Sequence, residues 1–318
     1  MTSWTPFLCC IALLVLTYVW RFQDLFPIIA KLQLVSLASL AALGFFMVDG
    51  HFSRLGFVSK HKLAKTAFFI MALMVGSTVF GIYVGNSFRF ITEDHIKNVL
   101  LMTMILAGLR SFKDVERLTL IHVIGAAGVC IWVVRFGRMR DGRLLGMPYY
   151  DANDLGMLVV CALPFCLYFL RYGSALNRLI GLAALPVLFT AFIRTGSRGG
   201  FLGLLAIGLF FVFKFDAFTR RTRVLCFGCG VAAMAFLAGD QYWELIQTLL
   251  HPTQDYNWAG NADTGRMEVW KRGLGYMIQR PIFGVGPYNF FVAEGTLSSH
   301  AQMQQLGEGF KWSVAHNS

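Results

Sequence analysis

Residues 194–200 read Arg-Thr-Gly-Ser-Arg-Gly-Gly, and they lie between two apolar runs, residues 178–193 and 200–214. Each run approaches the length that a helix needs to cross a bilayer. A central arginine costs about 2.5–3.5 kcal/mol on insertion scales, so ionisable residues in membrane segments mark candidate functional sites. Glycines leave the backbone open to close approach, and the second run begins at a helix amino end, which favours anions. The stretch therefore predicts an anion site at the end of a membrane helix.

The whole composition indicates a polytopic helical membrane protein. The 318 residues are 56% hydrophobic and 14% charged, whereas about a quarter of a soluble domain is charged. Nine apolar runs are candidate spans: 6–20, 25–48, 66–86, 95–109, 118–136, 154–171, 178–193, 200–214 and 223–239. We expect an all-α transmembrane bundle of about nine helices over residues 1–239, followed by a polar loop domain with short helices over residues 240–318.

The basic residues predict the orientation, because Lys and Arg favour cytoplasmic loops. With a cytoplasmic N-terminus, the inner loops near residues 54, 110, 171 and 220 are all basic. Two outer loops also carry arginine, one with Arg143 and one with Arg194 and Arg198, and this departure from the rule calls for a function. Residues 240–318 then lie outside. The net charge of +11 is explained by topology and anionic membrane lipid rather than by nucleic acid.

Four arginines on the predicted outer side suit phosphate: Arg143, Arg194, Arg198 and Arg266. Guanidinium groups pair with phosphate oxygens in bidentate fashion, and a hydrogen bond to a charged group contributes about 1.5–3 kcal/mol. Together they would hold a diphosphate and stabilise the charge that develops when a glycosyl–phosphate bond breaks. The alternative interpretation is that these arginines reach lipid headgroups at the interface.

His316 lies in the predicted outer loop, where an imidazole can act as a general base near neutral pH; the alternative is an ordinary exposed histidine. No His, Cys or Asp cluster has metal-ligand spacing, and no Walker loop or nucleophile elbow is present. The cysteines lie in apolar runs and are predicted to be small core residues. Asn153 or Asp154 is expected to cap the helix that follows it.

A further helix is predicted from Arg266 in the outer loop, after the cap residues Asp263 and Thr264. Its apolar positions recur at helical spacing, and Pro281 ends it. They are Met267, Trp270, Leu274, Met277 and Ile278.

These pieces together resemble the O-antigen ligase family of integral-membrane enzymes, which are also similar to O-antigen polymerases. In order, the matching pieces are Arg143-Leu-Leu-Gly146 with Asn153-Asp-Leu-Gly156, Arg194-Thr-Gly-Ser-Arg-Gly-Gly200, Thr264-Gly-Arg266 with Trp270 and Pro281-Ile-Phe-Gly-Val-Gly286, and Ala315-His316-Asn317-Ser318. Each piece is weak alone, but four in order and on one side of the membrane are more specific.

The resemblance implies a GT-C-like glycosyltransferase in the bacterial inner membrane, with its large loop in the periplasm. Such an enzyme moves a glycan from undecaprenyl diphosphate to a hydroxyl of lipid A–core or protein, without nucleotide sugar, metal or other cofactor. By position, Arg198 and Arg266 would bind the diphosphate, Arg194 and Arg143 would assist, and His316 would orient or deprotonate the acceptor hydroxyl.

Two alternatives stay open at this point. A polymerase that joins glycan repeats has the same donor side and a different acceptor, and an anion transporter would use the outer arginines without His316. Since the family continues beyond its His-Asn motif with further spans, we expect this chain to be truncated at its C-terminus, which leaves its activity open.

Overall fold

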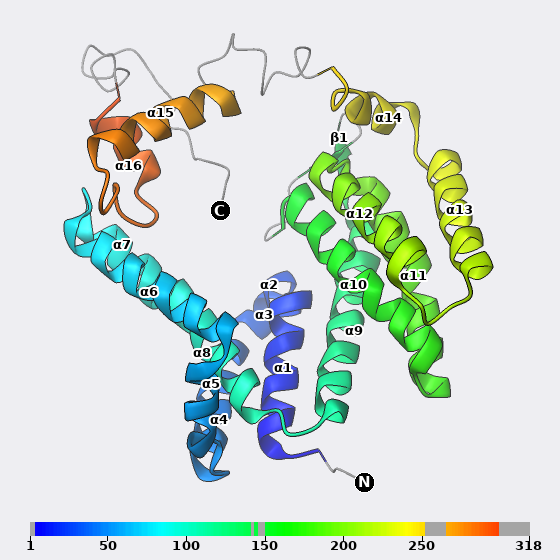
Figure 1. The fold of residues 1–318 in the computed structure, drawn as a ribbon, viewed down its shortest axis with the longest axis horizontal. Coiled ribbons are helices and arrows are strands. Elements are labelled where there is room, and N and C mark those ends of the chain that lie inside the picture. Colours follow the sequence, from blue (N-terminus) through cyan, green and yellow to red (C-terminus); the bar gives the residue numbers. More distant parts are fainter. Residues whose placement is uncertain (1–3, 141–142, 146–149, 252–264, 299–318) are drawn as a thin grey trace. The chain divides into compact units, whose positions relative to one another are not determined.

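The computed structural model describes residues 4–140, 143–145, 150–251 and 265–298. The predicted all-α class is confirmed, since the structure is 81% helical with almost no strand (Figure 1). The chain forms two compact units: a first unit of Met1–Asp49 with Leu109–Leu250, and a second unit of Gly50–Gly108 with His251–Ser318. This division reflects which helices pack together. The predicted boundary between residues 239 and 240 instead separates the membrane bundle from the loop domain, and it stays a prediction.

Short polar residues begin the later helices of the first unit. The side chains of Ser111, Asp151, Ser174, Ser197 and Thr219 each accept a backbone N–H in the first turn of the helix that follows, which satisfies amides that have no partner within the helix. The elements are α1 (Pro6–Trp20), α2 (Phe22–Leu25), α3 (Pro27–Ala30), α4 (Leu34–Val48), α9 (Phe112–Phe136), β1 (Arg138–Arg140), β2 (Arg143–Leu145), α10 (Ala152–Tyr172), α11 (Ala175–Thr195), α12 (Arg198–Lys214), α13 (Arg220–Leu237) and α14 (Asp240–Gln247).

The cap of α10 differs from the expectation. Asp151 is the N-cap, and its carboxylate accepts the amides of Asn153 and Asp154 at 2.7 Å each. The Asp154 carboxylate in turn accepts the amide of Asp151 at 3.3 Å, which completes a capping box. An aspartate two and three residues before these amides reaches both of them, so the side chain of Asn153 is available for another contact.

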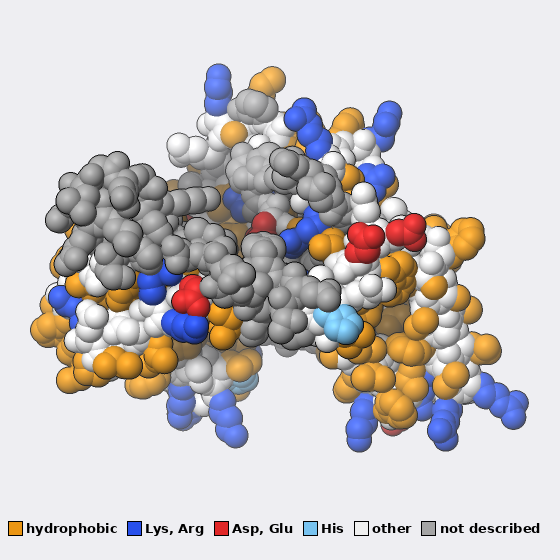
Figure 2. Space-filling view, turned by 90° about the horizontal axis from the view of Figure 1, so that it is seen from above, with side chains coloured by type: hydrophobic (Ala, Val, Ile, Leu, Met, Phe, Trp, Pro, Cys, Tyr) orange, Lys and Arg blue, Asp and Glu red, His pale blue; other side chains and the backbone are white. Residues whose placement is uncertain are grey.

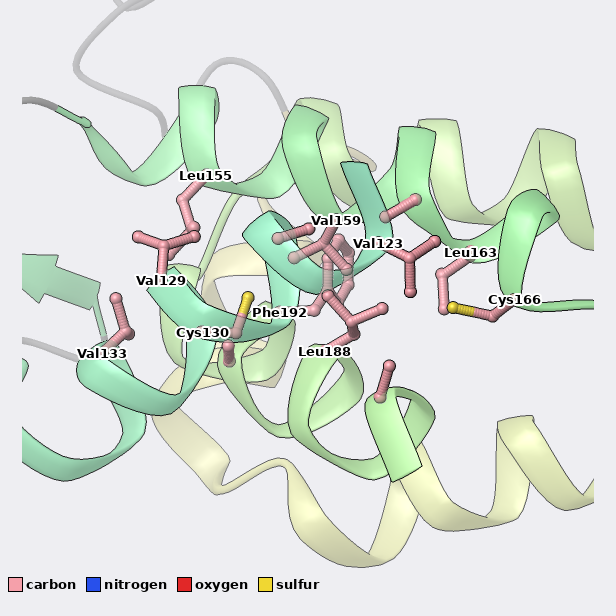
Figure 3. Packing of buried hydrophobic residues seen from close by; sticks show 14 of the residues in the cluster. Val123, Val129, Cys130, Val133, Leu155, Val159, Leu163, Cys166, Leu188 and Phe192 are labelled. Atoms are coloured by element: carbon pink, nitrogen blue, oxygen red, sulfur yellow. The ribbon is translucent and has the colours of Figure 1, made fainter. Parts of the chain in front are cut away.

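The core of the first unit lies among α9, α10 and α11 (Figure 3). Val129, Leu155, Val159, Leu188 and Phe192 are all buried there. The three helices pack together because a short turn joins α10 to α11, while the segment with β1 and β2 returns the chain from α9 to α10. This packing brings the C-terminal ends of α9 and α11 to the N-terminal end of α10.

Five helical segments of the described residues are long and apolar enough to cross a membrane: Ile28–Val48, α6 (Lys62–Phe80), α9, α10 and α11. The α13–α14 pair makes a sixth if the two helices, which are bent by 112°, form one broken span. The centres of the nine predicted spans are all helical, but α1, α8 and α12 are shorter than the five segments named above. Hydrophobic side chains cover much of the visible surface of both units, as in helices that face lipid (Figure 2).

The cysteines follow the core expectation only in part. Cys130 and Cys166 are buried, whereas the other thiols lie on partly or fully exposed helix surfaces, and all are free: Cys9, Cys10, Cys161, Cys226 and Cys229. A small apolar side chain is tolerated equally well in a core and on a surface that faces lipid, so composition alone does not separate the two positions.

The second unit combines membrane helices with the start of the predicted outer loop. Its elements are η1 (His51–Arg54), α5 (Leu55–Lys60), α6, α7 (Val84–Phe90), the π-helix η2 (Ile91–His95), α8 (Ile96–Gly108), α15 (Arg266–Gln279) and α16 (Phe290–Thr296). The helix predicted from Arg266 is confirmed as α15, which ends before Pro281. Its N-cap is Gly265, which offers no side chain to the first turn.

Candidate functional site

The segment from Arg194 to Gly200 forms the tight turn between α11 and α12. Gly196 has a φ of +57°, a left-handed conformation that favours glycine. Thr195 and Ser197 are buried, and the Thr195 hydroxyl accepts the amide of Ser197 at 3.1 Å. The Ser197 hydroxyl accepts the amide of Gly200 at 3.0 Å and so caps α12. The turn is therefore rigidly held, and Arg194 and Arg198 leave it from fixed positions.

Two glycines let the start of α12 approach α10 and α11 closely beside this turn. A Cβ on Gly156 would lie 3.1 Å from the Ser197 Cβ, and a Cβ on Gly200 would lie 3.0 Å from the Phe192 ring. The Ser197 hydroxyl also donates to the Asn153 side-chain oxygen at 2.9 Å. The two motifs that hold these residues, separated by some forty positions in the sequence, thus form one packed junction.

Arg194 is bound to the end of a neighbouring helix. Its Nη1 donates to the carbonyl of Val134 at 2.6 Å and to that of Val133 at 3.3 Å, in the last turn of α9. A cation there complements the partial negative charge of the helix C-terminus and satisfies carbonyls that have no partner within the helix. Part of the Arg194 guanidinium therefore has a structural role.

Arg198 opens α12 and is anchored to α14. Its Nη1 donates to the Thr248 hydroxyl at 2.8 Å, and that hydroxyl donates to the carbonyl of Leu245 at 2.7 Å. The next residue, Gly199, is exposed, and no atom lies within 4 Å of the place where its Cβ would be. The amino end of α12 thus presents a cation beside exposed backbone, an arrangement that suits an anion.

Arg143 lies on β2, in the hairpin that follows α9. The strands are antiparallel with Arg140 opposite Arg143, and β2 packs against α10 and α11. The Arg143 Nε is buried and has no hydrogen-bond partner within the described part of the chain. Arg143, Arg194 and Arg198 therefore lie at one end of the first unit, where α9 and α11 end and α12 begins (Figure 1).

The two other predicted site residues lie elsewhere. Arg266 is the first residue of α15, in the second unit. His316 lies outside the described residues, so its proposed role stays a prediction. Among the residues that the structure does describe, no group of His, Cys, Asp or Glu is arranged to hold a metal ion.

The motif Pro281–Gly286 docks on the junction between α6 and α7. The Ser77 hydroxyl donates to the carbonyl of Phe283, and the amide of Ile82 donates to that of Val285 at 3.0 Å. The rings of Phe80 and Phe283 stack with centroids 4.3 Å apart. Polar and apolar contacts thus attach this part of the predicted outer loop to the end of a candidate membrane span.

Two glycines and one asparagine complete this docking. Cβ atoms on Gly81 and Gly286 would meet neighbouring atoms at 2.8 and 2.7 Å, and Gly286 has a φ of +98°. The buried Asn289 amide donates to the Ser87 hydroxyl at 2.8 Å and to the carbonyls of Tyr83 and Val285 at 3.0 and 3.1 Å. Close backbone contact and a saturated amide fix the loop to the helix junction.

A buried carboxylate joins α15 to α16. Glu294 on α16 is fully buried, and Arg272 on α15 donates to both of its oxygens, from Nε at 2.9 Å and from Nη2 at 2.7 Å. The Tyr276 hydroxyl also donates to Glu294, at 2.6 Å. Burial and this carboxylate raise the pKa of Tyr276, because both disfavour a phenolate. The cluster is a structural link between the two helices.

Fold and site together define a multi-pass helical membrane protein with an arginine-rich helix end. Residues 182–318 match the family model described as O-antigen ligase. This match confirms the resemblance found in the motifs over residues 182–318. The family indicates activity of the O-antigen ligase or polymerase type. No curated protein and no solved structure matches the chain.

Sequence reasoning missed the residues that support the site rather than form it. Thr248, Asn289 and Glu294 are ordinary polar residues by spacing and composition, and no motif singles them out. Their partners lie 50, 202 and 22 positions away along the chain. Only the packing of helices shows that these side chains are bound.

Proposed function

We propose that this chain is an O-antigen ligase-like glycosyltransferase that moves a glycan from undecaprenyl diphosphate to an acceptor hydroxyl on lipid A–core or protein. Arg198 and Arg266 bind the diphosphate, with Arg194 and Arg143 assisting, and His316 acts as the general base. The observation that carries the proposal is that Arg143, Arg194 and Arg198 lie at one end of the first unit, and that Arg194 and Arg198 fall within the residues that match the O-antigen ligase family.

In this reaction the acceptor oxygen attacks the anomeric carbon of the donor glycan. The bond from that carbon to the phosphate oxygen breaks, and undecaprenyl diphosphate leaves with the electron pair. The acceptor proton passes to His316. Guanidinium groups stabilise the negative charge that develops on the leaving diphosphate. Such stabilisation of developing charge is usually the largest single contribution to lowering the reaction barrier.

The arginines divide between support and binding. The Nη1 of Arg194 is engaged by the carbonyls of Val133 and Val134, so Arg194 would assist diphosphate binding through its other N–H groups. The buried Nε of Arg143 has no hydrogen-bond partner among the described residues, and it suits an oxyanion because a buried donor without an acceptor is costly. Arg198 is held by Thr248 in a fixed position, which reduces the entropy lost when the diphosphate binds.

We place this arginine-rich end in the periplasm. The opposite ends of α9–α13 carry Lys113, Arg117, Arg171, Arg178 and Arg220, and basic residues favour the cytoplasmic side. An odd number of crossings before residue 240 then puts the remaining loop outside, with the N-terminus in the cytoplasm of a bacterial inner membrane.

The test is glycan transfer by the full chain in nanodiscs, with an undecaprenyl-diphosphate-linked glycan and lipid A–core as acceptor. Arg198→Ala, Arg266→Ala and His316→Ala should each abolish transfer without loss of protein. Arg138→Ala is the matched control, because Arg138 is an exposed residue of the same hairpin outside the proposed site, and it should retain transfer. Transfer by the triple variant would overturn the proposal.

A polymerase is the second candidate, because the family indication covers both activities. The same preparation distinguishes them when it is given undecaprenyl-diphosphate-linked glycan as the acceptor in place of lipid A–core. Longer glycans on undecaprenyl diphosphate identify a polymerase, and glycan on lipid A–core identifies a ligase.

A further inference from the structure

Helix α15 has three different faces. One face packs on α16 through the buried Val269 and Tyr276, and through Gly273, where a Cβ would lie 2.9 Å from the Phe290 ring. A second face is polar and contains Glu268 and the exposed Gln279. The third face is apolar, and among the described residues no layer of protein covers it.

This third face is a stripe of Leu274, Met277 and Ile278, and it continues into Ile282 in the following turn. All four side chains are exposed, with Ile278 at 71% and Ile282 at 83%. The spacing of the helical members puts them along one side of the helix. Contiguous exposed apolar side chains of this kind mark an interaction surface rather than an ordinary solvated one.

The end of α15 that carries this stripe is fixed at the end of a membrane span. Arg280, the residue after α15, donates from Nη1 to the carbonyl of Phe80 at 3.3 Å. Phe80 is the last residue of α6, one of the candidate spans, and it stacks on Phe283. Ile282 therefore lies near the end of this candidate span, beside the exposed side chains of Phe80 and Phe283.

We propose that α15 is an interfacial helix, with its apolar stripe in the boundary between lipid headgroups and acyl chains. With 14 residues, it extends about 21 Å at 1.5 Å per residue, and Figure 1 shows it crossing beyond the end of α6 and α7 instead of continuing their direction. Trp270 borders the stripe and is 38% exposed, as is typical of aromatic residues at the membrane surface. An amphipathic helix in this position binds through its apolar face.

The charges at the two ends of α15 fit the same partner. Arg266 begins the helix and Arg280 follows it, and long cationic side chains at an interface reach anionic headgroups. The interfacial position also holds Arg266 at headgroup depth, where the diphosphate of a lipid-linked donor lies. That last consequence rests on the proposed function, whereas the position of the helix does not.

The test uses the full chain in nanodiscs of phosphatidylethanolamine and phosphatidylglycerol, with a photoreactive residue placed at single positions. Ile278→p-benzoylphenylalanine and Leu274→p-benzoylphenylalanine probe the stripe. Gln279→p-benzoylphenylalanine is the matched control, since Gln279 is the exposed neighbour of Ile278 but lies on the polar face. After irradiation, mass spectrometry identifies what each position has captured.

Phospholipid adducts at positions 274 and 278, with none above the unirradiated background at 279, are the expected result. Adducts to another segment of this chain or to a second copy at positions 274 and 278 would overturn the proposal, as would equal lipid capture at all three positions or no capture at the stripe. The readout is lipid capture and not glycan transfer. The interfacial position of α15 can therefore be refuted while the proposed function holds, and the proposed function can be refuted while the interfacial position holds.

Discussion

Arg194 has two tasks if the proposed function holds, because both the C-terminal end of α9 and a bound diphosphate favour a cation. Its Nη1 satisfies the carbonyls of Val133 and Val134 at the end of α9. A guanidinium has five N–H donors in a planar fork, so one nitrogen can be engaged while the others stay available. A lysine at this position would have a single charged nitrogen for both tasks.

Arg194→Ala should therefore lower stability as well as transfer. Loss of a charged donor to two helix-end carbonyls should cost about 1.5–3 kcal/mol. The measurement is the apparent melting temperature in detergent, followed by tryptophan fluorescence. Arg138→Ala is the control and should leave it unchanged. An unaltered melting temperature for Arg194→Ala would show that water replaces the guanidinium at these carbonyls.

Gly286 is the position where the docked loop tolerates no side chain. Gly286→Ala should destabilise the second unit by more than about 1 kcal/mol, because alanine is strained at positive φ and its Cβ would lie 2.8 Å from the Ser87 hydroxyl. Gly284→Ala separates the two causes, since Gly284 has a φ of +65° but no atom within 4 Å of a Cβ. Thermal unfolding of the two variants should show the larger shift for Gly286→Ala, and equal shifts would contradict the role of close approach.

At the scale of elements, α15 and α16 are joined by a buried ion pair. Arg272 and Glu294 form two hydrogen bonds at 2.9 and 2.7 Å, and the Arg272 side chain is only 14% exposed. A buried pair adds little compared with apolar residues of the same shape, but removing one partner leaves an uncompensated charge. The pair therefore specifies which faces of the two helices meet.

Glu294→Ala should accordingly separate α16 from α15 at a cost of about 3–5 kcal/mol. Hydrogen exchange followed by mass spectrometry should show lost protection in both helices, with α10 and α11 unaffected. The double variant Arg272→Met with Glu294→Leu should regain most of that protection, because no buried charge is left unpaired. Equal exchange in the single and double variants would argue against this explanation.

At the scale of the whole molecule, helix direction decides which residues share one side of the membrane. The ends of α9 and α11 meet the starts of α10 and α12, so Arg194 and Arg198 lie at the end opposite Ser174 and Thr219. Short turns make α10, α11 and α12 successively antiparallel, and the segment with the β1–β2 hairpin returns the chain from the end of α9 to the start of α10. The membrane orientation then rests on the basic residues alone.

Reporter fusions test that orientation. Alkaline phosphatase fused after Leu250 should be active, because it folds with its disulfides only in the periplasm, whereas green fluorescent protein fused after Ser174 should fluoresce in the cytoplasm. Exchanging the two reporters between the two positions should abolish both signals. Reporter signals that put both positions on the same side of the membrane would contradict this topology.

Local patterns in the sequence were enough to predict the all-α class, the helix from Arg266 and the family. Apolar periodicity, caps and flanking charge act over a few residues, so they can be read without the fold. The predicted cap at Asn153 or Asp154 was wrong by two or three positions, because the helix begins earlier and the Asp151 carboxylate caps it by accepting the amides of Asn153 and Asp154.

The apolar face predicted for α15 is also a product of local spacing, yet spacing does not say what covers it. The structure turns Tyr276 and Val269 inward and leaves Leu274 and Ile278 exposed. A helix has room for several faces, and which one meets a neighbour depends on the other elements of the fold.

The sequence by itself determined the membrane class, the arginine-rich turn and the family, because these depend on residue type and short spacing. Tertiary structure alone decided that Arg194 binds carbonyls at the end of α9, that Thr248 binds Arg198 and that Asn289 attaches the loop to α7. These contacts join residues between 50 and 202 positions apart. Hydrogen bonds at such separations form only after helix packing has removed water and brought the partners together, so no local pattern encodes them.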